Sequence, residues 1–356
     1  MSMSSRPIKL LVCTQKVDRN DSDLGFFHVW LEKMASQVDS ITVICLEKGE
    51  YKLPSNVTVL SLGKEYRISR IAYLFRFYYY LWQYRRDYDA VFVHMNPEYA
   101  ILGGLPWRLW GKKVLLWYMH KAVNFRLWLA EKFVTKIFTA SKESFRLPSK
   151  KVEVTGHGID VDHFASRTEN KPDNAWKFLW VGRISPVKDL ETVILAVAAL
   201  KKMRPNFSIT LDVVGEPITN ADREYKRTIE ELVNKEAMKG IVRFAGGKKY
   251  SEMLGEYGTH HALIHTSRTG SLDKVVLEAL AAGILVFTSS EAYAGFGDLV
   301  VRFSANNYED LAQTIEKNMI SGILDNTAER RNFVRERHNL NLLVYKIDDY
   351  LSLDKF

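Results

Sequence analysis

The sequence predicts an α/β protein of two domains, each built on a doubly wound parallel sheet. The chain has 356 residues, which is too long for one ordinary core and suits two domains of about 150 to 200 residues. Short apolar, β-branched segments alternate with helical segments along the whole chain. This alternation is typical of parallel sheets with helices on both faces, and it occurs once in each half of the chain.

The first half contains six segments with the composition of buried strands. They are IKLLVCT (8–14), ITVICLE (41–47), VTVLSL (57–62), DAVFVH (89–94), KVLLWYMH (113–120) and KIFTAS (136–141). Helical patterns separate them, including those at 27–35 and 68–86. We therefore predict an N-terminal domain over residues 1–165.

The second half repeats the scheme. Its predicted strands are KFLWVGR (177–183), ITLDVVG (209–215), IVRFAGG (241–247), HALIHTS (261–267), ILVFTSS (284–290) and LVVRFS (299–304), and its helices include 190–203 and 222–238. The polar, proline-containing segment 165–176 is the predicted linker. From Tyr308 onward the chain is helical and charged. We predict a second domain over 166–340 and a last helix at 341–356 that packs back on the first domain.

Cysteine use and apolar run lengths bear on the compartment. The two cysteines, Cys13 and Cys45, lie in predicted strands, which favours buried free thiols over a disulfide framework or a zinc site. No run reaches the roughly 18 apolar residues of a membrane span. The N-terminal stretch MSMSSRPIKLLVC has no long apolar core or cleavage site of a signal peptide. We expect a cytoplasmic protein.

The net charge of +8 is concentrated in the first half. Residues 1–168 carry 25 Lys and Arg against 16 Asp and Glu, whereas residues 169–356 carry 25 against 26. A basic half beside a neutral one suggests that one domain faces a membrane surface, an anionic substrate or a nucleic acid. Segment 67–88 combines five arginines with many aromatic residues, which fits a membrane-surface helix or a core helix with one basic wet face. No RNP, KH or helix-turn-helix pattern supports nucleic-acid binding.

The segment VGRISPVKDLE (181–191) has the residues of a phosphate-binding loop. Gly182 ends a strand and lets a ligand approach the backbone. Arg183 offers a bidentate fork for phosphate oxygens, Lys188 adds a point charge, and the following helix contributes its N-terminus. The alternative is that both cations are solvated loop charges. Their place at the carboxyl edge of a strand favours a diphosphate site.

Other strand ends carry glycines with weaker signals. LDVVGEP (211–217) ends in Gly215, and FAGGKKY (244–250) presents Gly246 and Gly247; plain turns explain both as well as ligand contact does. Gly25 lies in the loop at 18–30 and would let that loop approach a ligand, but the loop contains no GxGxxG. A nicotinamide-dinucleotide site therefore lacks its usual fingerprint.

The stretch SRTGSLDKVVLEALAAG (267–283) places one acid, Glu278, in an apolar helical run. Asp273 is the expected helix N-cap and Gly283 the helix stop. Burying a bare carboxylate costs several kcal/mol, so Glu278 requires hydrogen-bond donors. Protein groups or ligand hydroxyls, such as those of a ribose, could supply them.

Histidines follow two strands of the first half. His94 ends DAVFVH and His120 ends KVLLWYMH, while His157 stands between two glycines in VEVTGHGIDVDHF (152–164). A histidine at the carboxyl edge of a strand is a candidate for hydrogen bonding or proton transfer to a ligand. The alternative is a structural histidine with satisfied bonds.

Taken in order, these motifs resemble retaining glycosyltransferases of family 4, which have the GT-B fold. The resembling segments are VGRISPVKDLE, LDVVGEP, the long block from VRFAGG to LVFTS, the hinge-like GHGIDVDHF and the first-domain WYMH. The resemblance implies two Rossmann-like domains facing each other across a cleft. The first would bind the acceptor and the second the nucleotide-sugar donor.

The resemblance also implies residue roles. Arg183 and Lys188 would neutralise the departing diphosphate, Glu278 would hold the ribose, and His120 would approach the donor sugar or the acceptor. The backbone near Gly246 and Lys248 would meet the base, and Gly25 would line the cleft near the phosphates. The donor site would also include Gly182, Gly215, Gly270, Ser271, Leu272, Asp273 and Val275. Such enzymes need no metal or other cofactor, because cations and helix N-termini stabilise the leaving group.

The sequence departs from the family pattern at two positions. The family has a first glutamate eight residues before the ribose-binding one, where this chain has Gly270. That departure affects contacts to the donor sugar, and Asp273 is a candidate replacement. The hinge carries His157 in place of asparagine.

The predicted function is transfer of a sugar from a UDP- or GDP-linked donor to a lipid-linked or cell-envelope glycan. The protein would then lie at the inner face of the plasma membrane, held there through 67–88, and would bind no nucleic acid. The alternatives are a nucleotide-sugar epimerase or hydrolase of the same fold, and a non-catalytic nucleotide-sugar-binding protein, which the absent first glutamate suggests. A dinucleotide oxidoreductase is a more distant alternative.

Overall fold

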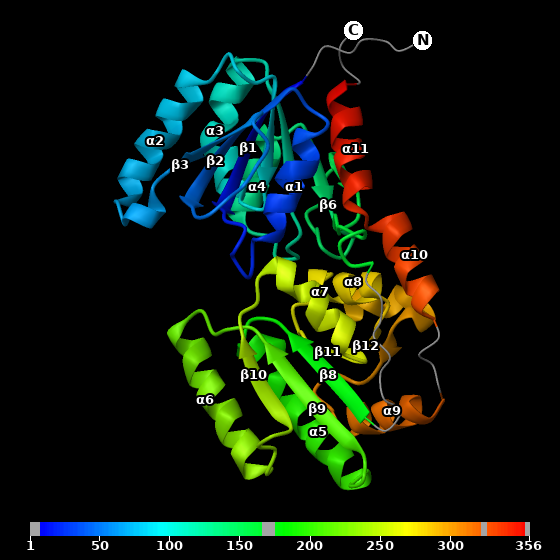
Figure 1. Cartoon of the computed structure of the whole chain (residues 1–356). Coiled ribbons are helices and arrows are strands. Elements are labelled where there is room, and N and C mark those ends of the chain that lie inside the picture. Colours follow the sequence, from blue (N-terminus) through cyan, green and yellow to red (C-terminus); the bar gives the residue numbers. More distant parts are fainter. Residues whose placement is uncertain (1–7, 166–174, 322–325, 353–356) are drawn as a thin grey trace. The chain divides into compact units, whose positions relative to one another are not determined.

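The computed structural model describes residues 8–165, 175–321 and 326–352 (Figure 1). The chain divides into two compact units. Unit 1 comprises Met1–Asp160 with Arg337–Phe356, and unit 2 comprises Val161–Glu336. The boundaries predicted after residues 165 and 340 lie a few residues beyond these divisions. Most of the predicted linker, residues 166–174, lies outside the described residues.

Unit 1 contains a seven-stranded parallel sheet in the order β3-β2-β1-β4-β5-β6-β7. Its strands are β1 (Lys9–Val17), β2 (Ser40–Lys48), β3 (Val57–Ser61), β4 (Ala90–His94), β5 (Lys113–Trp117), β6 (Lys136–Thr139) and β7 (Val152–Val154). The central strands are continuously apolar because helices cover both faces of the sheet, as parallel sheets require. Cys13 and Cys45 are buried free thiols, as predicted, and burial raises the pKa of Cys45 to about 12.

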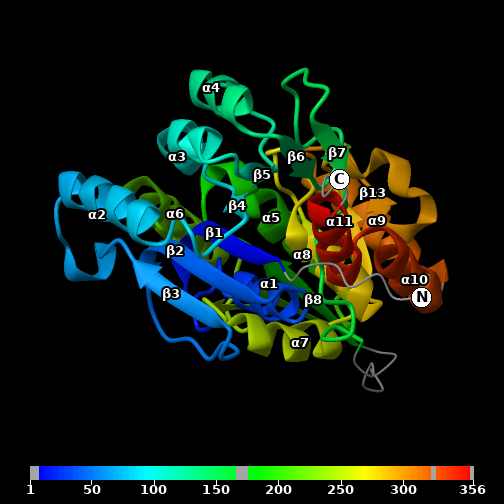
Figure 2. The ribbon, with the colours of Figure 1, turned by 90° about the horizontal axis from the view of Figure 1, so that it is seen from above.

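The helices of unit 1 cover the sheet in two layers. They are α1 (Phe26–Ala35), α2 (Arg70–Gln83), α3 (Pro97–Leu109), α4 (Phe125–Phe133) and α11 (Leu340–Ser352), with a short 3-10 turn η1 (Lys64–Tyr66). Figure 2 shows α2, α3 and α4 on one face and α1 on the other, where α11 packs against α1. The helix α2 begins at the cap Ser69, whose hydroxyl accepts from Ala72 N at 3.2 Å.

Unit 2 contains a six-stranded parallel sheet in the order β10-β9-β8-β11-β12-β13. Its strands are β8 (Ala175–Val181), β9 (Ser208–Val214), β10 (Val242–Gly246), β11 (Ala262–His265), β12 (Leu285–Thr288) and β13 (Val301–Arg302). Its helices are α5 (Leu190–Met203), α6 (Asn220–Lys235), α7 (Tyr250–Thr259), α8 (Lys274–Ala282), α9 (Tyr308–Ser321) and α10 (Thr327–Arg337), with 3-10 segments η2 (Pro186–Lys188) and η3 (Glu291–Leu299).

The two segments that join the units are hydrogen-bonded to each other within unit 1. Ile159 N donates to His338 O at 2.7 Å, and Leu340 N donates to Ile159 O at 2.8 Å. Gly156 has φ +79°, and a Cβ there would lie 2.1 Å from Arg337 O. A glycine is therefore required for the two backbones to approach. The chain leaves unit 1 and returns to it at adjacent points.

Each strand predicted from the sequence is present, with differences at the ends. The strand β5 ends at Trp117, so His120 lies beyond the strand rather than at its end. The predicted strand 299–304 is reduced to Val301–Arg302, and β7 was not predicted. Across the described ranges, no helix combines the length and apolarity needed to span a bilayer.

Candidate functional site

The carboxyl ends of β8, β9 and β10 present bare backbone at Gly182, Gly215 and Gly246. Gly182 N donates to Val214 O at 3.0 Å, and Gly215 N donates to Gly246 O at 2.8 Å. Gly215 has φ +141°, and a Cβ there would lie 1.9 Å from Gly182 O, so no side chain fits. Ligands of open parallel sheets bind at this edge, and here three neighbouring strands end in glycines that carry no side chain of their own.

A half-buried cluster joins the loops after β8 and β11, which are adjacent strands. Asp273 Oδ2 lies 2.5 Å from Lys188 Nζ and 3.0 Å from His265 Nε2. The other ring nitrogen of His265 lies 3.0 Å from Thr288 Oγ1. Burial opposes ionisation of Asp273, but the His265 hydrogen bond and the Lys188 charge outweigh it and hold the pKa of Asp273 well below its usual range. Asp273 is therefore a carboxylate that fixes the Lys188 ammonium.

Asp273 occupies the N-cap position of α8, as predicted, but its side chain makes no capping hydrogen bond. The carboxylate is turned to Lys188 and His265 instead. The first-turn N–H groups of α8 therefore have no side-chain cap, and such groups attract anions. Gly283 ends α8 with φ +84°, as predicted for the helix stop.

The turn that carries Lys188 is held by the loop after β11. Thr266 Oγ1 donates to Lys188 O at 2.8 Å, and Arg268 N donates to Val187 O at 2.9 Å. The Arg268 guanidinium also donates to Pro186 O. These bonds keep the Lys188 backbone in place without using its ammonium group.

Arg183 is more exposed than Lys188. Its side chain is 42% exposed, and Nε lies 3.8 Å from Asp222 Oδ2, near the limit of an ion pair. Asp222 belongs to a capping box with Thr219 at the start of α6. The Arg183 fork is therefore only loosely held and can reach an anion in solution.

Glu278 lies in α8 with 2% of its surface exposed. Tyr257, in α7, donates its hydroxyl to Glu278 Oε2 at 2.9 Å. Glu278 Oε1 lies 3.5 Å from Lys274 Nζ but accepts no hydrogen bond from any described residue. A protein donor thus serves one carboxylate oxygen, and a ligand hydroxyl remains a candidate for the other.

The loop before α8 has a glycine-dependent backbone. Gly270 has φ +63°, a left-handed conformation that disfavours side chains. Ser271 and Leu272 are buried at 8% and 1% exposure, and Val275 contributes its carbonyl to Tyr257 at 3.4 Å. Leu272 is therefore a packing residue of this loop.

Near β10, Gly246 has φ +73° and lies close to the Glu216 carboxylate, and Lys248 Nζ pairs with Glu256 at 3.3 Å. Glu256 belongs to the group Asp212, Glu256 and His260, the type of cluster that can hold a metal. Here Arg243 binds Asp212 through two hydrogen bonds, at 2.8 and 2.5 Å. The acids of this group are thus neutralised by protein cations.

The predicted residues Gly25, His94 and His120 belong to unit 1. Gly25 caps α1, where a Cβ would lie 2.4 Å from Asp21 O. His120 is exposed after β5, with its ring 5.4 Å from that of Tyr118. His94 is fully buried, stacked on Phe27 at 4.0 Å and 3.2 Å from Thr14 Oγ1. His94 is therefore structural.

The helix α2 carries an unusual apolar surface. Only Phe77 and Leu81 of this helix are buried, while exposed apolar side chains include Ile71, Leu74, Phe75, Tyr79 and Trp82. On the same sheet face, α3 exposes Leu105 and Leu109, and α4 exposes Phe125 and Trp128 (Figure 2). We call these nine residues the α2–α4 surface. A core helix with a basic wet face does not fit, because the wet face of α2 is mainly apolar.

Sequence reasoning missed His265 and Tyr257. His265 ends β11 and carries the same strand-end signal that singled out His94. Tyr257 carries no signal in the sequence, because its role depends on the packing of α7 against α8.

Comparisons with known proteins bear on the family and the fold. Residues 162–336 match the family model described as glycosyl transferases group 1. A segment of 150 residues is 28% identical to D-inositol 3-phosphate glycosyltransferase of Streptomyces scabiei, covering 39% of this chain. The match spans only about a third of that relative, 33% of its length.

Two solved structures are similar over nearly the whole chain. HepE of Anabaena, in complex with UDP, has a TM-score of 0.74 at 15% identity and covers 97% of this chain and 100% of its own. WaaG, described as a glycosyltransferase involved in lipopolysaccharide biosynthesis, has a TM-score of 0.68 at 15% identity and covers 96% and 99%. These likenesses show the fold, which is GT-B with two Rossmann-like units, as predicted.

Proposed function

Because residues 162–336 match the family model of glycosyl transferases group 1, we propose that the protein is a retaining glycosyltransferase with a UDP- or GDP-linked sugar donor. The observation that carries the proposal is the Lys188–Asp273–His265 cluster at the carboxyl edge of unit 2. It holds a cation beside the uncapped N-terminus of α8, which is the chemistry that a diphosphate requires.

Lys188 and Arg183 are the proposed catalytic cations of this unit. Asp273 fixes the Lys188 ammonium through one of its three donors, and the other two remain for phosphate oxygens. Arg183, being loosely held, closes on the same diphosphate. Together with the α8 N–H groups they stabilise the leaving group without a metal. His120 of unit 1 is proposed to act on the donor sugar or the acceptor.

The nucleoside is proposed to bind at one end of the diphosphate, with its ribose at Glu278 and its base at the ends of β9 and β10. Glu278 Oε1 would accept a ribose hydroxyl, while Tyr257 keeps the other oxygen in place. The bare backbone at Gly215 and Gly246, with Lys248, would face the base. Gly25 would lie near the phosphates.

The binding site for the donor sugar would lack the acid that the family places at the position of Gly270. Asp273 is a poor replacement because both Lys188 and His265 already bind its carboxylate. We assign it to holding Lys188. Contacts to the sugar would then come from the backbone and hydroxyls of the 269–271 loop.

For the acceptor we propose a lipid-linked or cell-envelope glycan at an anionic membrane. The α2–α4 surface supports it, as does the excess of cations in residues 1–168. The involvement of WaaG in lipopolysaccharide biosynthesis supports the same proposal. A soluble sugar phosphate is the second candidate, because the curated relative acts on inositol 3-phosphate according to its name.

The donor site is tested by thermal unfolding with UDP, GDP, ADP and CMP. One nucleotide diphosphate at a hundred times its Kd should stabilise the protein by about 2.7 kcal/mol. Glu278→Ala and Arg183→Ala should lose that shift relative to their own melting temperatures. Arg204→Ala is the matched control, since Arg204 pairs with Glu316 away from this edge.

Absence of any shift in the unaltered protein would overturn the donor site. Product analysis separates the enzyme classes. Transfer requires an acceptor, whereas an epimerase or hydrolase changes or frees the sugar without one. A nucleotide shift with no change of the sugar in either assay indicates a binding protein.

A further inference from the structure

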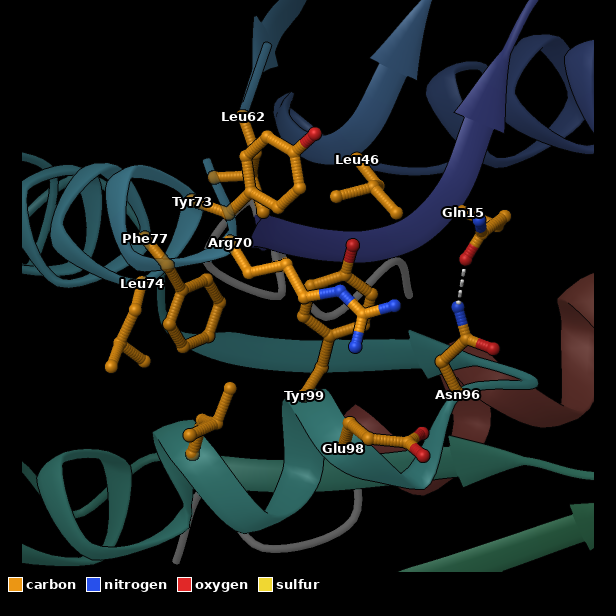
Figure 3. A pocket seen from close by; sticks show the side chains of 11 residues that line it. Gln15, Leu46, Leu62, Arg70, Tyr73, Leu74, Phe77, Asn96, Glu98 and Tyr99 are labelled. Atoms are coloured by element: carbon orange, nitrogen blue, oxygen red, sulfur yellow. Dashed lines mark hydrogen bonds between the residues drawn. The ribbon is translucent and has the colours of Figure 1, made fainter. Parts of the chain in front are cut away.

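Unit 1 contains a cavity of about 440 Å³ between α2, the ends of the β1, β2 and β3 strands, and α3. Figure 3 shows its wall of leucine and aromatic side chains, among them Leu46, Leu62, Leu74, Tyr73 and Tyr99. Cavities of this volume and lining are typical of small-molecule sites. No residue of this cavity belongs to the donor site.

Most polar groups of the cavity are already engaged. Asn96 Nδ2 donates to Gln15 Oε1 at 2.8 Å, and Glu98 pairs with Arg126 at 2.8 Å. Arg70 points into the cavity (Figure 3), and the ion pairs of the described residues include none for it. The cavity therefore presents one cation that has no ion pair among the described residues, in a lining that is mostly apolar but includes Gln15, Asn96 and Glu98.

The cavity is continuous with the α2–α4 surface. Leu74 lines the cavity and is also 39% exposed. It lies one turn from the exposed Ile71 and Tyr78 on α2. An apolar row thus leads from the surface of the helix to the cavity.

We propose that this cavity binds the hydrocarbon segment next to the phosphate of a lipid phosphate, with Arg70 binding the phosphate. The apolar lining matches a hydrocarbon chain, and the guanidinium fork matches phosphate oxygens. Arg70 is the first residue of α2, so the positive end of the helix adds to the attraction. A sugar alone would find part of the polar lining already engaged, because Asn96 Nδ2 binds Gln15 Oε1 and Glu98 pairs with Arg126.

That this lipid phosphate is the acceptor rests on the proposed glycosyltransferase function. The binding site itself does not. Occupation of the cavity would place the phosphate at the carboxyl edge of the unit 1 sheet, close to the end of β1, where Gln15 lies.

The test is calorimetric titration of the full chain, without nucleotide, with decyl phosphate below its micelle concentration. Sodium phosphate and decanol are titrated in parallel, to separate the head from the chain. Leu74→Trp and Leu102→Trp fill the cavity, and Arg70→Gln removes the cation. Ile71→Trp adds the same bulk on the exposed side of α2 and is the matched control.

Decyl phosphate should bind more tightly than either partial ligand. Leu74→Trp and Leu102→Trp should weaken the affinity for decyl phosphate by at least about tenfold, while Ile71→Trp leaves that affinity unchanged. No binding by the unaltered protein, or equal binding by Leu74→Trp and Ile71→Trp, overturns the proposal. If Leu102→Trp fails to fold by circular dichroism, Leu74→Trp decides, because its site is partly exposed.

The two proposals fail separately. If a nucleotide raises the melting temperature but decyl phosphate does not bind, only the lipid-phosphate proposal is overturned. Decyl phosphate binding without a nucleotide shift overturns the transferase and leaves a lipid-phosphate site of another purpose.

Discussion

At the scale of single residues, Asp273 shows how one carboxylate sets the state of a neighbouring cation. Asp273 and Lys188 have side chains only 14% and 21% exposed, so solvent screens their attraction weakly. The sequence predicted a role for each residue, with Asp273 as a helix N-cap and Lys188 as a phosphate-binding cation. Their contact was beyond prediction because it depends on β8 and β11 being neighbours, which only the sheet order decides.

Asp273→Asn should lower the free energy of unfolding by about 3 kcal/mol at pH 7, because it leaves Lys188 without its partner. Urea unfolding measures this. Glu236→Gln is the control, since it breaks the exposed Lys202–Glu236 pair and should cost less than about 1 kcal/mol. Equal losses in both variants would contradict the assignment.

The same pair predicts a dependence on pH. The folded-state pKa of Asp273 is depressed, so its stabilisation is complete above the ordinary aspartate pKa of about 3.9 and is lost as the pH falls. The difference between the unaltered protein and Asp273→Asn should therefore narrow below about pH 4. If this difference in the free energy of unfolding increased as the pH fell, the assignment of Asp273 as a stabilising carboxylate would be contradicted.

Gly270 is the second residue-scale test. Because its φ is +63°, both Gly270→Ala and Gly270→Glu should destabilise by about 1 to 2 kcal/mol. The alanine variant carries the backbone strain without the acid, so it is the matched control for turnover. More sugar transfer by the glutamate variant than by the alanine variant would indicate a site that lost its acid. Equal or lower transfer supports a remodelled site.

At the scale of elements, periodic segments were predicted best. The helix α5 spans Leu190–Met203, as predicted, because an apolar stripe of period 3.6 faces the sheet. The strand β7 has no fully buried residue, so its sequence lacked the apolar run of the others. The predicted helix at 68–86 is shorter, spanning Arg70–Gln83. Its residues Phe75, Tyr79 and Trp82 face outward, which periodicity alone could not decide.

The outward face of α2 predicts membrane binding. The triple change Phe75→Ser, Tyr79→Ser and Trp82→Ser should remove most binding to phosphatidylglycerol-containing vesicles, measured by co-sedimentation, because it deletes the apolar contact area. Vesicle binding should become weaker and less dependent on salt when serine replaces the five arginines Arg67, Arg70, Arg76, Arg85 and Arg86. Tyr345→Ser is the control, because Tyr345 is 66% exposed on α11, across the sheet. Unchanged binding by the triple variant would exclude α2 as the contact.

At the scale of the whole molecule, the two-domain α/β architecture followed from length and alternation, and the charge asymmetry falls mostly on unit 1. The sequence could not show the cavity beneath α2, because its lining comes from five separate segments of the chain. The sequence predicted that the last helix packs back on the first domain. It could not show the close backbone approach at Gly156, where the chain returning from Arg337 onward rejoins unit 1.

The paired crossings at Ile159 and His338 have a consequence for descent. A segment whose two ends meet can be inserted into a host, or exchanged, without breaking the host's core. Unit 2 has this property, so it could be replaced as one segment while the unit that contains the cavity stayed intact. Under the proposed function, donor and acceptor preferences could then evolve at different rates.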